Sequence, residues 1–174
     1  MPMPITARLQ QVKLLLLDVD GVLTDGMIIY DDSNVETKMF NVKDGLGIRL
    51  LIDNGIQVGI VTGRSAPALT HRCKNLGIEI IFDGIRDKAK ALESIIRQTG
   101  RNPQEIAFMG DDLPDLPIMN RVGLGIAVAD AHDHVRNEAL LVTSANGGKG
   151  AVREVSEAIL KAKGLWDKVL DTYK

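Results

Sequence analysis

Residues 14–25, LLLLDVDGVLTD, constrain the fold more than any other part of the chain. Four leucines in succession before a turn sequence are typical of a strand buried on both faces, as in a parallel sheet. Asp18 and Asp20 follow this strand at its carboxyl end, where open α/β sheets bind ligands. Carboxylates beside a core are costly unless they are paired, so the segment indicates a cation site or proton exchange. A polar strand end with a purely structural role is the alternative.

Strand-like and helix-like segments alternate through the rest of the chain. Further strands are predicted at QVGIVTGR, IEIIFDG, IAFMGDD, VGLGIAVAD and ALLVTSA. Helical segments lie between them, including DGLGIRLLIDNG, which stops at Gly55, and the segment from Pro67 to Gly77. This alternation predicts a doubly wound, mostly parallel, Rossmann-like α/β sheet with right-handed crossovers.

One element breaks the alternation. Two β-rich runs flank DDSN, a favourable turn sequence, which predicts a β-hairpin at about residues 26–41. Its first strand carries four consecutive apolar residues (27–30), so both of its faces would be exposed in a monomer. No linker divides the 174 residues, and we expect one domain, 1–174, with a tail at about 147–174 after a flexible joint, GGKG.

Composition argues against several classes of partner. The formal net charge is −2, so we expect no broad basic surface for nucleic acid or an anionic membrane. Aromatic residues make up 3% of the chain, which leaves little for base stacking. The start, MPMPITARLQQ, has no apolar signal core, and the leucine run is too short to span a bilayer. A cytoplasmic protein is therefore expected.

The single cysteine and the histidines are poor candidates for chemistry. Cys73 shares a helical face with Leu69 and Leu76, which indicates core packing, and one cysteine cannot form an internal disulfide. The histidines lack a cluster with the spacing of a zinc site. We interpret all three as surface or capping residues: His71, His132 and His134.

Oxygen-bearing and cationic side chains follow several predicted strands. The carboxyl ends of parallel strands meet at one edge of a sheet, so these groups can converge. Carboxylates suit Mg²⁺, and hydroxyl and ammonium groups suit a phosphate. Alone, each residue could be a helix cap, a solvated charge or a polar turn, but their joint occurrence favours a site. They are Asp18, Asp20, Thr62, Lys88, Asp111, Asp112 and Asp115.

These segments resemble the four motifs of the haloacid dehalogenase-like phosphatases. DVDGVLTD is similar to motif one, VTGR to motif two, the Lys88 region to motif three and GDDLPD to motif four. FNVKDGLGIRLL, HRCKNLGI, VADAH and GGKGAVREV resemble the capless, tetrameric branch, and the likeness runs from about Val12 to Ala158. The resemblance implies a haloacid dehalogenase-like fold, without a cap domain, that hydrolyses a phosphate ester with Mg²⁺.

The resemblance also implies a role for each acid of motifs one and four. Asp18 would attack phosphorus and become an aspartyl-phosphate. Asp20 would protonate the departing alkoxide and then activate water, and its backbone carbonyl would bind Mg²⁺. Asp111 would give the metal a second carboxylate, and Asp112 and Asp115 would orient metal-bound waters and the motif-three lysine.

Substrate binding is implied for further residues. Thr62, Gly63 and Lys88 would hold the transferring phosphoryl group. By the same resemblance the substrate is a sugar-acid phosphate, 3-deoxy-D-manno-octulosonate 8-phosphate, of lipopolysaccharide precursor synthesis. A nine-carbon acid such as N-acylneuraminate 9-phosphate is the alternative, since the catalytic residues touch only the phosphate. Candidates for the sugar acid are Arg64, Arg72 and Arg86 for its carboxylate and Asp44 for its hydroxyls.

The oligomeric state and two non-enzymatic alternatives also follow from these segments. The resemblance implies a homotetramer built through the hairpin, with the segment after Gly147 reaching a neighbour's active site. Two non-enzymatic alternatives are a phospho-accepting receiver module and a catalytically idle assembly module. The receiver alternative is weak because the phospho-accepting Asp of receiver domains lies on a middle strand, whereas the best acceptor here follows the first strand. The full motif set argues against an idle module.

Overall fold

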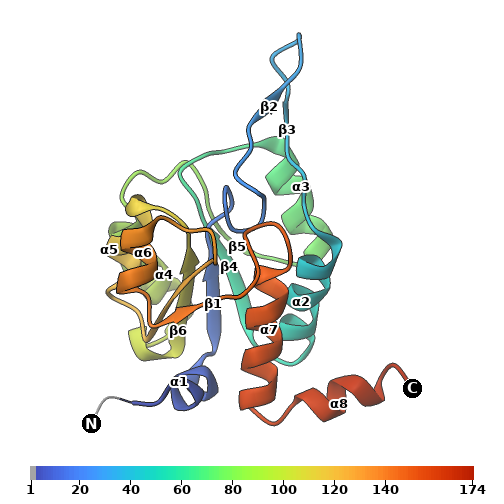
Figure 1. Ribbon diagram of the computed structural model, residues 1–174, viewed down its shortest axis with the longest axis vertical. Coiled ribbons are helices and arrows are strands. Elements are labelled where there is room, and N and C mark those ends of the chain that lie inside the picture. Colours follow the sequence, from blue (N-terminus) through green and yellow to red (C-terminus); the bar gives the residue numbers. More distant parts are fainter. Residues whose placement is uncertain (1–2) are drawn as a thin grey trace.

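The computed structural model describes residues 3–174 as a parallel sheet between two layers of helices (Figure 1). Residues 1–2, which the expected domain and N-terminal segment include, lie outside the described part. Six parallel strands follow the order β5-β4-β1-β6-β7-β8, which confirms the predicted α/β fold. The strands are β1 (Leu14–Leu17), β4 (Gln57–Val61), β5 (Ile80–Phe82), β6 (Ile106–Gly110), β7 (Leu124–Ala127) and β8 (Leu141–Val142).

Helices cover both faces of the sheet. In Figure 1, α2, α3 and α7 lie on one side of it and α4, α5 and α6 on the other. None of the helices formed by residues 3–174 has the length and apolar character needed to cross a membrane. The helices are α1 (Ile5–Gln11), α2 (Val42–Asp53), α3 (Pro67–Leu76), α4 (Lys88–Thr99), α5 (Leu116–Met119), α6 (Asp133–Glu138), α7 (Ala151–Ala162) and α8 (Trp166–Asp171), with short 3₁₀ turns η1 (Pro103–Glu105) and η2 (Leu113–Asp115).

Two short helices, α1 and α6, have no counterpart among the predicted elements. At the start of α6, the backbone N–H of His134 donates to Nδ1 of His132 at 3.1 Å, so His132 is the helix cap. All three histidines are exposed, as interpreted from the sequence. Cys73 is 1% exposed within the core, and burial raises the pKa of its thiol to about 11. Its predicted packing role is confirmed.

Strand β1 lies at the centre of the sheet, with β4 on one side and β6 on the other. All four of its leucines are fully buried, because helices cover both faces. From β1 the chain builds outward through β4 and β5, and it then returns to β6 on the opposite side of β1. The edge above β1 and β6 is therefore the topological switch point where open α/β sheets bind ligands.

The predicted hairpin is present and projects from the body of the molecule (Figure 1). Its strands are β2 (Ile29–Tyr30) and β3 (Glu36–Thr37), paired antiparallel. In the turn, Oδ1 of Asp31 accepts hydrogen bonds from two backbone N–H groups, at 2.9 and 2.8 Å, and Asn34 adopts a φ of 60°. No cap domain is formed by residues 3–174; this short ribbon is the insertion after β1.

The GGKG segment is not the flexible joint that its glycines predicted. The N–H of Gly148 donates to the carbonyl of Val22 at 2.8 Å, and the N–H of Gly147 donates to Oδ1 of Asp130 at 2.9 Å. A Cβ atom at Gly147 would collide with the carbonyl oxygen of Gly21. Glycine is therefore needed for close backbone approach, and the segment packs against the motif-one loop.

Candidate active site

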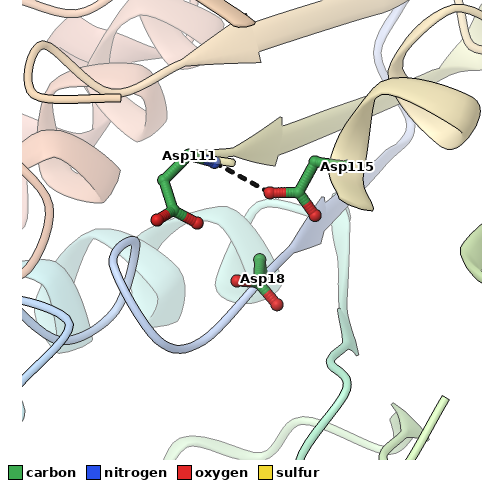
Figure 2. A group of neighbouring side chains, drawn as sticks. All are labelled: Asp18, Asp111 and Asp115. Atoms are coloured by element: carbon green, nitrogen blue, oxygen red, sulfur yellow. Dashed lines mark hydrogen bonds between the residues drawn. The ribbon is translucent and has the colours of Figure 1, made fainter. Parts of the chain in front are cut away.

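Three carboxylates converge at the carboxyl ends of β1 and β6 (Figure 2). Asp18 follows β1, and Asp111 and Asp115 follow β6, the neighbouring strand. One oxygen atom from each carboxylate lies within 4.8 Å of the other two. Asp18 lies more than ninety positions before the other two acids, and it meets them because β1 and β6 pair directly. We call Asp18, Asp111 and Asp115 the acidic cluster.

Lys88 joins two members of this cluster from the first turn of α4. Its Nζ lies 2.8 Å from Oδ1 of Asp18 and 2.5 Å from Oδ1 of Asp115. The lysine side chain is 5% exposed, so both ion pairs are buried. Burial acts to lower the pKa of the Lys88 ammonium, but the two carboxylates outweigh this effect and raise it. The cluster therefore contains a permanently charged lysine.

Both carboxylate oxygens of Asp115 have partners in the protein, whereas the side-chain oxygens of Asp111 have no hydrogen-bond partner among residues 3–174. Oδ2 of Asp115 accepts from the backbone N–H groups of Asp111, at 2.8 Å, and Asp112, at 3.3 Å. The Asp111 side chain points toward Asp18 (Figure 2). A Cβ atom at Gly21 would occupy the position of the Asp111 carboxylate, so the glycine of motif one leaves space for it. The free oxygens thus belong to Asp18 and Asp111.

Burial and crowding raise the pKa values of both carboxyl groups. Burial, followed by the charge of Asp115, raises the pKa of Asp18 to about 6, although Lys88 opposes this. Burial, followed by the charges of Asp18 and Asp115, raises the pKa of Asp111 to about 8. Three carboxylates oppose one ammonium, so the cluster carries excess negative charge. Mg²⁺ commonly takes one or two protein carboxylates and keeps waters, and this donor set fits it.

We expect Mg²⁺ to stabilise the protein more at pH 8 than at pH 6. The carboxyl of Asp111 has a folded pKa of about 8 and an ordinary value of 3.8. The metal-free protein therefore loses stability as pH rises between these values, and Mg²⁺, which binds the ionised form, offsets the loss. At a hundredfold excess over Kd, the melting temperature should rise by roughly 5–10 °C at pH 8. NaCl of equal ionic strength is the control; an equal rise at both pH values would contradict the assignment.

The acidic cluster forms one wall of an open cleft of about 450 Å³. Thr62 is 2% exposed at the end of β4, on the other side of β1 from Asp111. Its hydroxyl accepts a hydrogen bond of 3.5 Å from the N–H of Arg64. Most of the predicted site residues thus meet in one place. The cleft is lined by Asp18, Asp20, Thr62, Gly63, Arg64, Ile85, Arg86, Lys88, Asp111, Asp112, Pro114 and Asp115.

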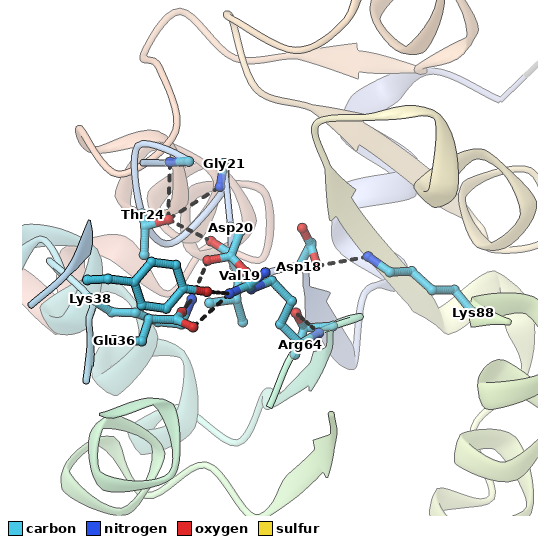
Figure 3. Close-up of polar contacts among 12 residues, drawn as sticks. Asp18, Val19, Asp20, Gly21, Thr24, Glu36, Lys38, Arg64 and Lys88 are labelled. Carbon is cyan, nitrogen blue, oxygen red and sulfur yellow. Dashed lines mark hydrogen bonds and ion pairs between the residues drawn. The ribbon is translucent and has the colours of Figure 1, made fainter. Parts of the chain in front are cut away.

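Asp20 is bound by hairpin residues that the sequence did not single out (Figure 3). The Nζ atom of Lys38 forms an ion pair with Oδ1 of Asp20 and lies 2.7 Å from Oε1 of Glu36. Burial acts to lower the pKa of Lys38, but its hydrogen bonds to both acids raise it. The sequence feature that could have identified these residues is the alternation of charges in ETK, because residues two apart lie on one face of a strand.

Asp44 and Arg72 lie outside the cleft, and their predicted roles as sugar ligands are wrong. Asp44 is 1% exposed, and its oxygens accept from the N–H groups of Gly150, at 3.2 Å, and Arg153, at 2.8 Å. It therefore binds the start of α7. Arg72 donates to the carbonyl of Asn41 at 3.2 Å and stacks near an aromatic ring. Neither residue lines the cleft at the sheet edge.

Asp112 lines the cleft but does not contact Lys88, contrary to the prediction that it helps to orient the lysine. Its Oδ1 accepts from the N–H of Leu113 at 2.8 Å, so it caps the η2 turn. The contact to Lys88 comes from Asp115. Asp112 is exposed, which leaves its second oxygen free to bind water beside the acidic cluster.

The fold and the acidic cluster define a haloacid dehalogenase-like hydrolase, and the sequence model of that family matches residues 78–155. The 3-deoxy-D-manno-octulosonate 8-phosphate phosphatase KdsC of Escherichia coli strain K12 is 43% identical over 164 residues, 94% of this chain and 87% of the relative. The chain therefore belongs to the family of the 3-deoxy-D-manno-octulosonate 8-phosphate phosphatases.

Two solved structures are similar over nearly the whole chain. The phosphatase from Moraxella catarrhalis, in complex with a magnesium ion, a phosphate ion and a KDO molecule, has a TM-score of 0.96 and 42% identity, with 98% of both chains covered. The cobalt-bound phosphatase from Haemophilus influenzae has a TM-score of 0.91 and 42% identity, covering 96% of this chain and 99% of that one. Both relatives bind a divalent metal ion.

Proposed function

We propose that this chain is a Mg²⁺-dependent phosphatase that hydrolyses 3-deoxy-D-manno-octulosonate 8-phosphate, in lipopolysaccharide precursor synthesis. The observation that carries the proposal is the acidic cluster with its buried Lys88, set in the open cleft of a capless chain. The name of the Escherichia coli relative and the ligands of the Moraxella catarrhalis relative support the substrate and the metal. A cytoplasmic location stays a prediction.

In the first half-reaction, the carboxylate of Asp18 attacks phosphorus. A bond forms between this oxygen and phosphorus, and the bond from phosphorus to the 8-oxygen of the sugar breaks. Asp20, at the edge of the same cleft, gives a proton to the departing alkoxide. Lys88 lies 2.8 Å from Asp18, where its charge favours the ionised carboxylate and holds it in place for the attack. The product is the free sugar acid and an aspartyl-phosphate.

In the second half-reaction, water attacks the phosphorus of the aspartyl-phosphate. Asp20 takes a proton from this water, the bond to the Asp18 oxygen breaks, and inorganic phosphate leaves. Mg²⁺, held by Asp18, Asp111 and the backbone carbonyl of Asp20, would neutralise charge on the phosphoryl oxygens. Thr62, Gly63 and Lys88 line the cleft beside Asp18 and supply donors for the same oxygens.

The carboxylate end of the substrate is assigned to arginines at the mouth of the cleft. Arg64 and Arg86 both line it, and the Arg64 side chain is 40% exposed. The Nε atom of Arg64 is buried and has no hydrogen-bond partner among residues 3–174, so the exposed part of the guanidinium is what a ligand can reach. A guanidinium fork matches a carboxylate geometrically, which favours Arg64 as the main contact.

The direct test is phosphate release from eight- and nine-carbon sugar acid phosphates, measured side by side with and without Mg²⁺. We expect turnover of 3-deoxy-D-manno-octulosonate 8-phosphate that is lost with a chelator and restored by added Mg²⁺. A higher kcat/KM for N-acylneuraminate 9-phosphate would replace the substrate, and no Mg²⁺-dependent release from either would reject the function.

We infer a homotetramer from the hairpin. Its apolar side chains are exposed, with Met27 at 67% and Tyr30 at 58%, which is costly for a monomer. Sedimentation velocity should give a tetramer for the wild-type chain and a smaller species for Met27→Asp, with Asp32→Asn in the same hairpin as the control. A stable, active wild-type monomer would contradict the inference.

The C-terminal tail is assigned to a neighbouring active site. Helix α8 lies at the end of the molecule opposite the hairpin, so within one chain it is remote from the cleft (Figure 1). Removing residues 163–174 should lower kcat/KM for the sugar acid phosphate in the assembled enzyme. The rise in melting temperature given by Mg²⁺ should persist, because the acidic cluster is intact. Unchanged kinetics would count against a lid role for the tail.

A further inference from the structure

A group of charged side chains connects the hairpin to the motif-one loop (Figure 3). Lys38, directly after β3, forms one ion pair with Asp20 and a second with Glu36. The side chain of Lys38 is 3% exposed, and those of Asp20 and Glu36 are 21% and 16% exposed. We call Asp20, Glu36, Lys38 and Arg64 the hairpin cluster. It lies beside the acidic cluster but shares no residue with it.

Arg64 completes the hairpin cluster from the loop after β4. One guanidinium nitrogen, Nη2, lies 2.7 Å from Oε2 of Glu36 and donates to the Tyr30 hydroxyl at 3.0 Å. Its Nε lies 3.8 Å from Oδ2 of Asp20. Glu36 therefore holds both cations, and both cations face Asp20. Two segments, the hairpin and the loop after β4, hold the carboxylate of a third, the motif-one loop.

The hairpin cluster is balanced in charge, unlike the acidic cluster. Two carboxylates face two cations, so it has no need of a metal ion. Placing a lysine ammonium in a nearly inaccessible position is costly unless it is paired, and the partner here is the acid of motif one. Lys88 pairs with Asp18 and Lys38 pairs with Asp20, so each of the two motif-one acids has a lysine partner of its own.

We propose that Lys38 is a positioning residue that sets the Asp20 carboxyl group at the leaving-group side of the cleft. The inference rests on the proposed function, in which Asp20 is the acid and base. Proton transfer requires the acid within hydrogen-bond reach of the departing oxygen. Lys38 fixes that geometry from the hairpin without touching the phosphate. The hairpin thus contributes a functional group to the active site as well as an apolar surface.

The test is Lys38→Met assayed on phenyl phosphate, p-nitrophenyl phosphate and the sugar acid phosphate. Both aryl esters lack the sugar acid, so they report the chemical step alone. The phenyl leaving group needs a proton far more than p-nitrophenolate does. We expect kcat for phenyl phosphate and the sugar acid phosphate to fall about 10- to 100-fold, with little change for p-nitrophenyl phosphate. Lys38→Arg should restore part of the loss.

Lys43→Met is the matched control, because Lys43 is an exposed lysine at the start of α2. Equal losses on both aryl esters, no loss on either, or a change confined to KM for the sugar acid phosphate would each overturn the inference. If Lys38→Met does not fold, Glu36→Gln loosens Lys38 and should give the same pattern in weaker form. Wild-type turnover of the sugar acid phosphate, in the same assay, tests the proposed function separately.

Discussion

Asp18→Asn protein should fold but lose its turnover, with or without Mg²⁺. We expect kcat to fall by at least about 10⁴-fold. The amide oxygen is not a nucleophile toward phosphorus, so no aspartyl-phosphate can form. The side chain keeps its size, and Asp18 is 7% exposed in a packed position, so we expect little change in shape. Phosphate release and circular dichroism measure the two effects.

Asp32→Asn is the control for this substitution, since Asp32 is an exposed carboxylate in the hairpin turn. Its kcat should match the wild-type value. If purified Asp18→Asn protein released phosphate at the wild-type rate, Asp18 would not be the nucleophile. Loss of the folded far-ultraviolet spectrum would make the kinetic result uninformative, and Asp18→Glu, which keeps the charge but moves the carboxylate, then tests the same assignment.

Lys88→Met should lower both activity and stability. Without the ammonium, Asp18 and Asp115 lose ion pairs of 2.8 and 2.5 Å in a buried position. Removing one partner of a buried pair typically costs 3–5 kcal/mol, so we expect a loss of about 3 kcal/mol in the metal-free protein. Loss of one donor to the transferring phosphoryl group should lower kcat by about 10²- to 10³-fold. Urea unfolding and phosphate release measure the two effects.

Mg²⁺ should recover part of the stability lost in Lys88→Met, because it offsets the same excess of negative charge. Lys90→Met, an exposed lysine in the first turn of the same helix, should leave both quantities unchanged. Wild-type stability and activity in Lys88→Met would contradict the place given to this lysine. A loss of stability that Mg²⁺ leaves unaltered would show that the lysine and the metal act independently.

The sheet and the acidic cluster could be predicted because their signals are local. The leucines of β1 specify a strand buried on both faces, and the acids after β1 and β6 are predicted to converge from the rules for parallel sheets alone. The motif resemblance added roles for the individual residues. Lys88 could be located only as the start of a helix, and its position between Asp18 and Asp115 required coordinates.

The parts that could not be predicted depend on contacts between distant segments. Asp44 looked like a free acid, but it binds the start of α7, more than a hundred positions later. The glycines of GGKG looked like a joint, yet Gly147 is there because the backbone of Gly21 lies against it. Lys38 gave only a weak local signal, since its partner Asp20 belongs to the preceding loop.

Identification of the phosphorylated residue tests the central claim most directly. Wild-type protein is mixed with 3-deoxy-D-manno-octulosonate 8-phosphate and Mg²⁺, quenched in acid within one turnover, digested and mapped by mass spectrometry. We predict one added phosphoryl group, on the peptide that contains Asp18, and none when a chelator replaces Mg²⁺. Phosphate release in the same mixture without a phosphoryl group on Asp18, or with one on another residue, would contradict the account.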